Sequence, residues 1–163
     1  MYLDKNEKRV VYSLAGNYHK FNTQEYSSYS FGLSYVKNAN HEFELLYTKD
    51  SDDVKTIDSY YKYYIKNNPY FNIFIGANHI YDLDNNDNSN YGYDYGYYLK
   101  IKFGDLIYYP FFSRTEIENN EESSYTTMGV SILFNDVGIQ PEYSKANDGS
   151  TFYKIKFYLW EFR

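Results

Sequence analysis

The sequence contains no cysteine. This absence excludes a disulfide framework, a cysteine nucleophile and a zinc site built from thiolates. The sequence also lacks an uninterrupted apolar run of about 18 residues, the length that is typical of a transmembrane helix. If this protein crosses a membrane, it must therefore do so with strands.

Positive charge is in deficit, because 16 Lys and Arg residues stand against 22 Asp and Glu residues and the formal net charge is -6. Nucleic acids and anionic lipid headgroups attract clustered cations, so we expect no nucleic-acid partner. The chain of 163 residues has no linker rich in Pro, Gly or Ser. We expect one domain over residues 1–163, long enough to bury a sizeable core.

Aromatic residues are abundant, with 24 Tyr, 12 Phe and 1 Trp making up 23% of the chain. Tyr and Phe favour strands, so the composition predicts an all-β protein. The first residues, MYLDKNEKRVVYS, lack the apolar core of a secretory signal peptide. Either the protein is not exported or a leader has been removed, and the sequence leaves both interpretations open.

Apolar and polar residues alternate along most of the chain. In YGYDYGYYLKIKF, residues 91–103, every odd position is aromatic or aliphatic and most even positions are small or charged. A strand turns successive side chains to opposite faces, so this pattern predicts one apolar and one polar face. Segment 106–117 fits least well, because both of its phases are apolar and Pro110 would remove a ladder hydrogen bond. With this segment included, the sequence predicts ten strands, at 10–19, 28–35, 42–48, 61–66, 71–78, 91–103, 106–117, 127–134, 137–144 and 153–160.

The connections between these segments alternate between short and long. Tight connections fall at 38–40, 67–69, 104–105 and 135–136, and longer polar ones at 22–25, 50–55, 82–90, 118–124 and 145–150. In an up-and-down meander, this order places the tight turns and both termini at one end of the sheet and the long loops at the other.

These features resemble those of bacterial outer-membrane β-barrels, although no particular member is indicated. The resemblance rests on alternating segments, an even strand count, and short turns opposite longer loops. Tyr29 and Tyr35 bracket Phe31 and Leu33 as in an aromatic girdle. The last stretch, FYKIKFYLWEFR, is similar to the terminal segment of such barrels but ends in Arg163 instead of an aromatic residue.

The resemblance implies an antiparallel up-and-down transmembrane β-barrel of about ten strands, with eight as the alternative. It also implies location in the bacterial outer membrane after removal of a leader, with the lipid bilayer as partner. The apolar phase would then face lipid, at Tyr29, Phe31, Leu33, Tyr35, Phe71, Ile73, Ile75, Tyr95, Tyr97, Leu99, Ile101, Val130, Ile132, Ile155 and Phe157.

The polar phase would line the lumen, with seven cationic and five acidic side chains that could nearly neutralise one another. A ten-stranded lumen is narrow, so we expect a salt-bridged plug or a small pore for ions or small solutes. Glu44 and Lys62 are the expected ion pair. The predicted lumen residues are Glu42, Glu44, Lys62, Lys66, Asp94, Lys100, Lys102, Arg114, Glu116, Glu142, Lys154 and Lys156.

Two other functions remain as alternatives. The same strands could form a soluble, lipocalin-like barrel that holds an apolar ligand among inward Tyr and Phe. The long loops could also serve surface recognition. Small residues such as Gly32, Gly76 and Gly92 on the polar phase favour a crowded lumen over a convex outer surface.

No catalytic motif is evident, and we expect neither enzymatic activity nor a cofactor. His19, His41 and His79 have no second His, Asp or Ser at catalytic or ligand spacing. The loop DLDNNDNSN, residues 82–90, offers several acidic oxygens but departs from the EF-hand pattern, with Asp87 at the position of the usual Gly. It is best interpreted as a solvated loop without metal.

Overall fold

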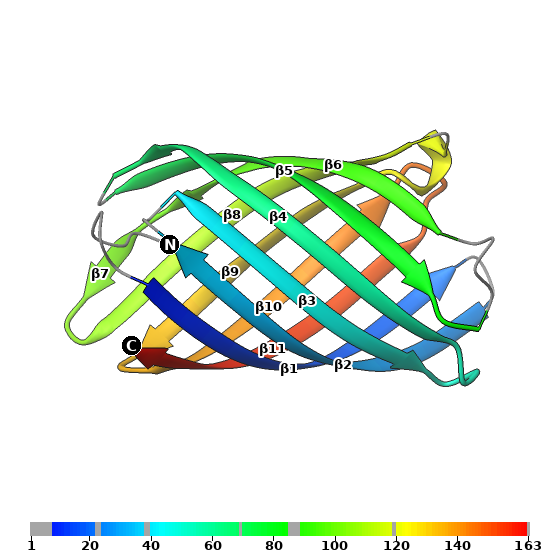
Figure 1. Ribbon diagram of the computed structural model, residues 1–163, viewed down its shortest axis with the longest axis horizontal. Helices are drawn as coiled ribbons and strands as arrows, with labels where there is room; N and C mark the ends of the chain where they lie inside the picture. Colours follow the sequence, from blue (N-terminus) through cyan, green and yellow to red (C-terminus); the bar gives the residue numbers. More distant parts are fainter. Residues whose placement is uncertain are drawn as a thin grey trace.

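The computed structural model of the chain is a closed antiparallel β-barrel (Figure 1). The structure describes residues 8–21, 24–37, 40–68, 70–84, 89–118 and 120–162. None of these residues belongs to a helix long and apolar enough to cross a membrane. The elements are β1 (Lys8–Phe21), β2 (Gln24–Lys37), β3 (His41–Asp50), β4 (Lys55–Asn67), β5 (Phe71–Asp82), β6 (Asn90–Leu99), β7 (Ile101–Phe103), β8 (Leu106–Ile117), the 3-10 turn η2 (Glu121–Ser123), β9 (Tyr125–Phe134), β10 (Val137–Ala146) and β11 (Thr151–Phe162).

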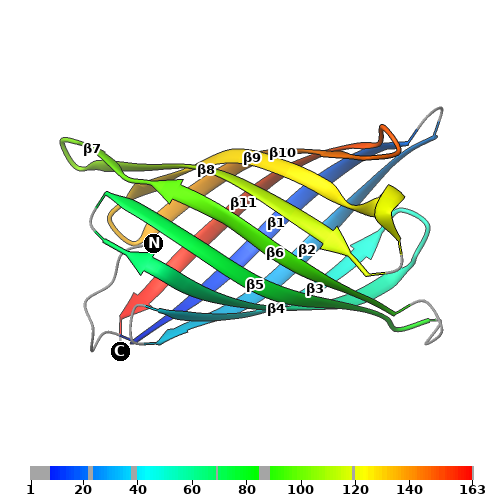
Figure 2. The ribbon, with the colours of Figure 1, turned by 90° about the horizontal axis from the view of Figure 1, so that it is seen from above.

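Strands that are consecutive in the sequence pair with each other, except β6 and β7, and two further pairings close the sheet. β1 pairs with β11, and β6 pairs with β8. The strands cross both walls of the barrel at a steep tilt to its axis (Figure 2). The predicted up-and-down barrel of about ten strands is therefore confirmed, and β7 is an additional short strand.

The extra strand arises where the predicted strand 91–103 is interrupted at Lys100. β6 and β7 both pair with β8, and the pairing is missing at Leu99 and Lys100, which stand opposite Pro110 and Tyr109. Proline has no N–H to donate to the ladder, so pairing breaks there. The Lys100 N–H instead donates to the Tyr70 carbonyl oxygen at 2.8 Å. Segment 106–117 nevertheless forms a strand, β8, with the predicted bounds.

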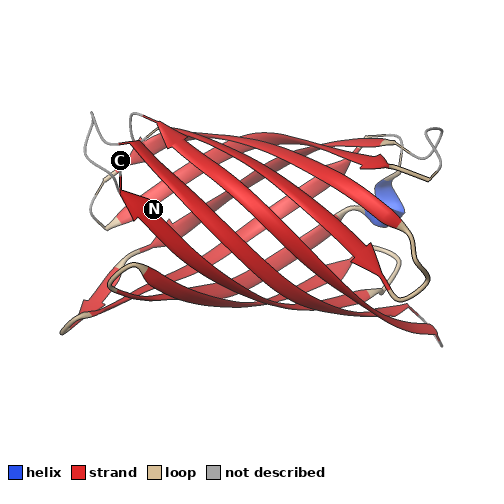
Figure 3. Ribbon diagram, turned by 60° about the horizontal axis from the view of Figure 1, so that its bottom comes forward, coloured by secondary structure: helices blue, strands red, loops and turns tan. Residues whose placement is uncertain are grey.

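The two ends of the barrel differ as the connection lengths predict. The start of β1, the end of β11 and the β7–β8 hairpin lie at one end, here called the turn end. The η2 segment lies at the opposite end, here called the loop end (Figure 3), and so does the β10–β11 connection (Figure 1). The predicted separation of tight turns from long loops is confirmed except at 22–25, where Phe21 of β1 pairs with Gln24 of β2 and the connection contains only two residues.

The apolar phase of the strands faces outward. On β2, Phe31 is 56% exposed whereas its neighbour Ser30 is 1% exposed, and this alternation continues along the strand. A soluble barrel has the reverse arrangement, with bulky apolar side chains inside. The lipocalin-like alternative is therefore wrong about which phase faces inward.

Close backbone approach explains why glycine stands on the inner face of β6. A Cβ atom at Gly96 would lie 2.4 Å from the Phe112 carbonyl oxygen and 2.8 Å from the Ser113 Cα atom. These are backbone atoms of the adjacent strand β8, so they can move aside only if the two strands separate.

We expect Gly96→Ala to lower the free energy of unfolding by about 1–3 kcal/mol, the range typical of overpacking. Urea unfolding in lipid vesicles, followed by circular dichroism, would measure it. Gly16→Ala is the matched control, because nothing lies within 4 Å of a Cβ atom at Gly16. An equal loss in both variants would contradict the close approach of β6 to β8.

Candidate functional site in the barrel lumen

The lumen contains two cavities of unequal size. The larger, about 400 Å³, reaches the loop end, where Asn120 and Ser123 line it. The smaller, about 70 Å³, lies in the half of the lumen toward the turn end. Tyr98, Gln140 and Lys156 line both cavities and so form the partition between them.

A cluster of apolar and aromatic side chains fills the lumen toward the turn end. Val11, Tyr109, Leu133 and Tyr158 are buried against one another, and Tyr98 packs against them. The rings continue inward, with centroid distances of 5.3 Å from Tyr98 to Phe111, 5.4 Å from Tyr98 to Phe74 and 6.0 Å from Phe74 to Tyr64. This aromatic plug consists of Val11, Tyr64, Phe74, Tyr98, Tyr109, Phe111, Leu133 and Tyr158.

The predicted lumen set omits this plug. Tyr64, Phe74, Tyr98 and Tyr158 all stand in the otherwise polar phase of their segments. Their recurrence near the turn end of β4, β5, β6 and β11 is a pattern from which the plug could have been predicted.

Gln140 connects the plug to the polar part of the lumen. Its Oε1 atom accepts hydrogen bonds from Tyr158 at 3.2 Å and from Ser131, and its Nε2 atom donates to Glu142. Both ends of this half-buried amide are therefore satisfied. This network links the ring of Tyr158 to a carboxylate that lines the larger cavity.

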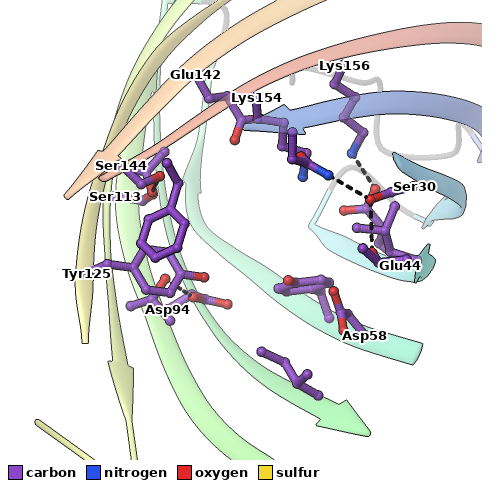
Figure 4. A pocket seen from close by; sticks show the side chains of 18 of the residues that line it. Ser30, Glu44, Asp58, Asp94, Ser113, Tyr125, Glu142, Ser144, Lys154 and Lys156 are labelled. Carbon is purple, nitrogen blue, oxygen red and sulfur yellow. Dashed lines mark hydrogen bonds and ion pairs between the residues drawn. The ribbon is translucent and has the colours of Figure 1, made fainter. Parts of the chain in front are cut away.

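One buried ion pair links distant strands across the inner wall of the barrel. Lys156 of β11 donates to Glu44 Oε1 of β3, and the two side chains are 13% and 9% exposed (Figure 4). Strands β1 and β2 lie between them. Their inner faces carry small residues, with Ser13 opposite Gly32, which leaves room for the lysine side chain.

The expected pair Glu44–Lys62 is wrong. The register places Lys62 opposite Glu42, and Glu44 opposite Tyr60. Lys62 instead extends over the Phe74 ring, with Nζ 5.4 Å from the centroid. Glu42 accepts a hydrogen bond from the Tyr64 hydroxyl.

Asp94 lies in the lumen and is held by neutral donors. Asn78 Nδ2 donates to both carboxylate oxygens at 3.1 Å, and Thr115 Oγ1 donates to Oδ1 at 2.7 Å. In the register, Gly76 stands between Asp94 and Lys62. Because Gly76 has no side chain, the carboxylate and the lysine share one open stretch of wall.

Small polar side chains line the wall made by β1, β2 and β3. Asn17 Nδ2 donates to Ser28 at 3.0 Å and to Ser30 at 3.1 Å, and Ser30 contacts Thr48 at 2.9 Å. These contacts satisfy most of the local polar groups without charge.

The fold also brings His19 to Ser28, a contact that the sequence spacing did not indicate. The His19 Nε2 atom lies 3.2 Å from Ser28 Oγ, and the ring stacks on Tyr26 at 4.4 Å. However, His19 Nδ1 is buried without a hydrogen bond among the described residues. The pair therefore lacks the third group that orients the base in a catalytic triad.

Seven of the predicted lumen residues lie on the inner face and line one or both cavities. They are Glu42, Glu44, Lys62, Asp94, Glu142, Lys154 and Lys156.

The lumen prediction is wrong for Arg114 and Glu116, which lie on the outer face of β8. The register sets them beside the outward Tyr95 and Tyr93. Arg114 Nε donates to Glu116 Oε1 at 2.9 Å. Both phases of β8 are apolar over much of their length, so the charges did not reveal which phase faces inward.

The three remaining lysines of the predicted lumen set lie near the turn end, and only Lys102 clearly departs from the prediction. Lys102 is exposed on β7, where that strand extends at the turn end. Lys100 is half-buried at the same end, with Nζ 5.8 Å from the centroid of the Tyr109 ring. A register shift after Tyr64 pairs Lys66 with the outward Ile73, and the Lys66 side chain lies outside the described residues.

The side chains predicted to face lipid all stand on the outer face. Most are exposed there. Phe71, Ile73, Val130 and Ile132 are half-buried, because neighbouring side chains cover part of each.

The acidic residues in the loops at the loop end make ordinary hydrogen bonds at the protein surface. Asp82 Oδ1 accepts the Asp84 N–H at 2.9 Å, and Asp84 Oδ2 accepts the Lys55 N–H at 3.2 Å. A hydrogen bond from Lys49 lowers the pKa of the exposed Asp53 carboxyl below its ordinary value. Asp87 lies outside the described residues, and no group of three potential metal ligands occurs within the part of the chain that the structure covers.

Removing one member of the buried pair should be costly. We expect Lys156→Met to lower the free energy of unfolding by about 3–5 kcal/mol, because Glu44 would remain charged and buried without its partner. Adding Glu44→Gln should recover part of this loss. Urea unfolding of the two single variants and the double variant in lipid vesicles would measure the coupling.

The outer pair Arg114–Glu116 is the matched control for this measurement. Its carboxylate side chain is 43% exposed, so Arg114→Met should change the free energy of unfolding by only about 0–1 kcal/mol. Additive effects at Lys156 and Glu44 would argue against the inner pair.

Comparison with known proteins identifies the fold of this chain and nothing more specific. No family model and no curated protein matches the chain. A de novo designed transmembrane β-barrel is 10% identical with a TM-score of 0.52, over 99% of this chain and 100% of that one. Omp33 of Acinetobacter baumannii is 9% identical with a TM-score of 0.46, over 96% and 99% of the two chains. The translocator domain of autotransporter NalP from Neisseria meningitidis is 8% identical with a TM-score of 0.49, over 97% and 88%. The likeness to the designed barrel shows that this chain has the fold of a transmembrane β-barrel.

Proposed function

We propose that the chain is an integral β-barrel of the bacterial outer membrane with a closed lumen, a structural or anchoring role and no catalytic activity. The observation that carries this proposal is the outward apolar phase. On β2, Phe31 is exposed while Ser30 is buried, and the same inversion recurs on the other strands. An apolar outer band with a polar interior is the arrangement that lipid requires.

The dimensions of the barrel support insertion in a bilayer. The strands other than β7 contain 10–14 residues, and a tilted strand needs about 9–11 residues to cross the apolar core of a membrane. Along β1, exposed Leu14 lies between exposed Tyr12 and Tyr18. Such tyrosines would form girdles at the two membrane–water interfaces.

The aromatic plug argues against a permanent pore. It occupies the lumen toward the turn end and leaves a cavity of only about 70 Å³ in that half. An ion crossing this barrier would have to lose its water, because packed rings occupy much of that half of the lumen. A barrel closed in this way can serve as a structural element or anchor in the membrane. It offers no continuous aqueous path.

We expect the chain to remain folded and monodisperse only in detergent or lipid, because the exposed apolar band would associate in water. The folded form should also migrate differently from the boiled form in detergent gels. A protein that is folded and monodisperse in plain buffer would contradict the proposal.

Single spin labels provide the orientation control for this experiment. Labels at positions 31 and 33 should be relaxed by oxygen, which concentrates in lipid. Labels at positions 30 and 48 should be relaxed by a water-soluble nickel complex, since these residues line the larger cavity. An exchange of these two responses would show that the barrel is inverted.

Closure of the lumen by the plug leads to a separate prediction about ion conductance. We expect no steady ion current through the wild-type barrel in a planar bilayer, and a measurable current through the Tyr98→Ala, Tyr158→Ala double variant. Both rings belong to the plug, and Tyr98 stands in the partition between the cavities. Tyr95→Ala is the control, because Tyr95 stands on the outer face of the same strand as Tyr98. Equal currents through all three proteins would refute closure by the plug.

A further inference from the structure

We propose that the larger cavity binds a small zwitterion, whose ammonium group is held by Asp58 and whose carboxylate is held by Lys154. The cavity has a volume of about 400 Å³ and both residues line it. This inference rests on the proposed membrane barrel only in that the cavity is then reached from the loop end.

Asp58 is a buried acceptor whose hydrogen bonding is incomplete. It lies on β4 and is 9% exposed, and its Oδ1 atom has no hydrogen-bond partner within the described chain. Its cross-strand neighbours on the inner face are Leu46 and Ile80, which have no side-chain donor, and Thr56 of the same strand is the side-chain donor beside it. Because Oδ1 has almost no accessible surface, the ammonium group of a ligand would meet the carboxylate at its other oxygen, where it would offset the cost of burying a charge without a full set of donors.

Lys154 offers the opposite charge from the other side of the cavity. It lies on β11, facing Asn17 of β1 and Glu142 of β10 in the register. Among the residues that the structure describes, no ion pair or hydrogen bond engages its ammonium group. Lys156, two residues further along β11, already forms an ion pair with Glu44. Lys154 is therefore the amine of β11 that is available to a ligand.

The two groups face each other across the cavity and not along one wall. In one direction around the barrel, β1, β2 and β3 separate β11 from β4, and in the other direction more strands intervene. Figure 4 shows Lys154 and Asp58 on opposite sides of the open space. A molecule that satisfies both must carry a positive group at one end and a negative group at the other.

The charge balance of the lining favours such a dipolar molecule over a simple ion. The cavity is lined by four carboxylates, on Glu44, Asp58, Asp94 and Glu142, and by three amines, on Lys62, Lys154 and Lys156. The near balance gives neither sign a strong advantage. A metal ion is not favoured, because the described residues contain no cluster of three suitable ligands.

The site can be tested with three dipeptides of nearly equal size: Ala-Ala with free ends, its N-acetyl form and its C-terminal amide. Isothermal titration calorimetry on the whole barrel folded in detergent would measure their binding. We expect Ala-Ala to bind and each blocked form to bind at least about tenfold more weakly, since each loses a charge-assisted hydrogen bond.

Two variants assign the ends of the ligand. Asp58→Asn should weaken Ala-Ala binding at least about tenfold and abolish the preference over the N-acetyl form, while the preference over the amide remains. Lys154→Gln should do the converse. Glu116→Gln is the matched control, because it removes the same charge as Asp58→Asn but on the outer face of β8, and it should bind Ala-Ala as the wild type does.

Several results would overturn the inference. These are no binding of Ala-Ala, equal binding of all three dipeptides, or unchanged binding by the Asp58→Asn variant, each with a protein shown to be folded by its heat-modifiable migration. Such a result would leave the membrane barrel intact. Conversely, a barrel that is folded and monodisperse in plain buffer would refute the membrane proposal, and its dipeptide binding could still be measured.

Discussion

The pairing of β1 with β11 is the constraint on which the rest of this structure depends. The register runs from Arg9 opposite Phe162 to Lys20 opposite Thr151, so the two ends of the meander pair along nearly their full length. Closure leaves no long strand edge without a partner and turns one phase of every strand into an interior. It also brings Lys156 close enough to reach Glu44 three strands away.

The two halves of this closed interior differ in the side chains that fill them and in how the buried polar groups find partners. Toward the turn end, aromatic rings fill much of the lumen, and polar side chains such as Ser34, Glu42 and Ser131 line the small cavity that remains. Toward the loop end, hydroxyl and amide side chains satisfy one another around a larger cavity. Gln140 stands at the boundary and hydrogen-bonds to both regions. The proposed closure at the turn end is therefore compatible with a cavity of about 400 Å³ toward the loop end.

Charged side chains follow the same division between inside and outside. The pair Glu44–Lys156 is buried and bridges strands, whereas Arg114–Glu116 stands on the outer surface near the loop end, in contact with Asn147. The first pair restrains the barrel because each partner would be costly to bury alone. The second has a carboxylate that is 43% exposed, so we expect it to contribute less to stability. Sequence spacing cannot distinguish the two, because all four residues stand in strands of alternating or mixed character.

The sequence by itself determined the features that depend on local backbone geometry. The two-residue period specifies strands and their faces, as on β2, and the connection lengths specify the up-and-down order and the two unlike ends. Only the tertiary structure decided which charges meet, that Pro110 would split β6 from β7, and that β8 would turn Arg114 outward. It also decided that Tyr64, Phe74, Tyr98 and Tyr158 would converge on one plug and leave Asp58 and Lys154 facing a cavity. The physical reason is that a period describes one strand, whereas register and closure set the distances between strands far apart in the chain.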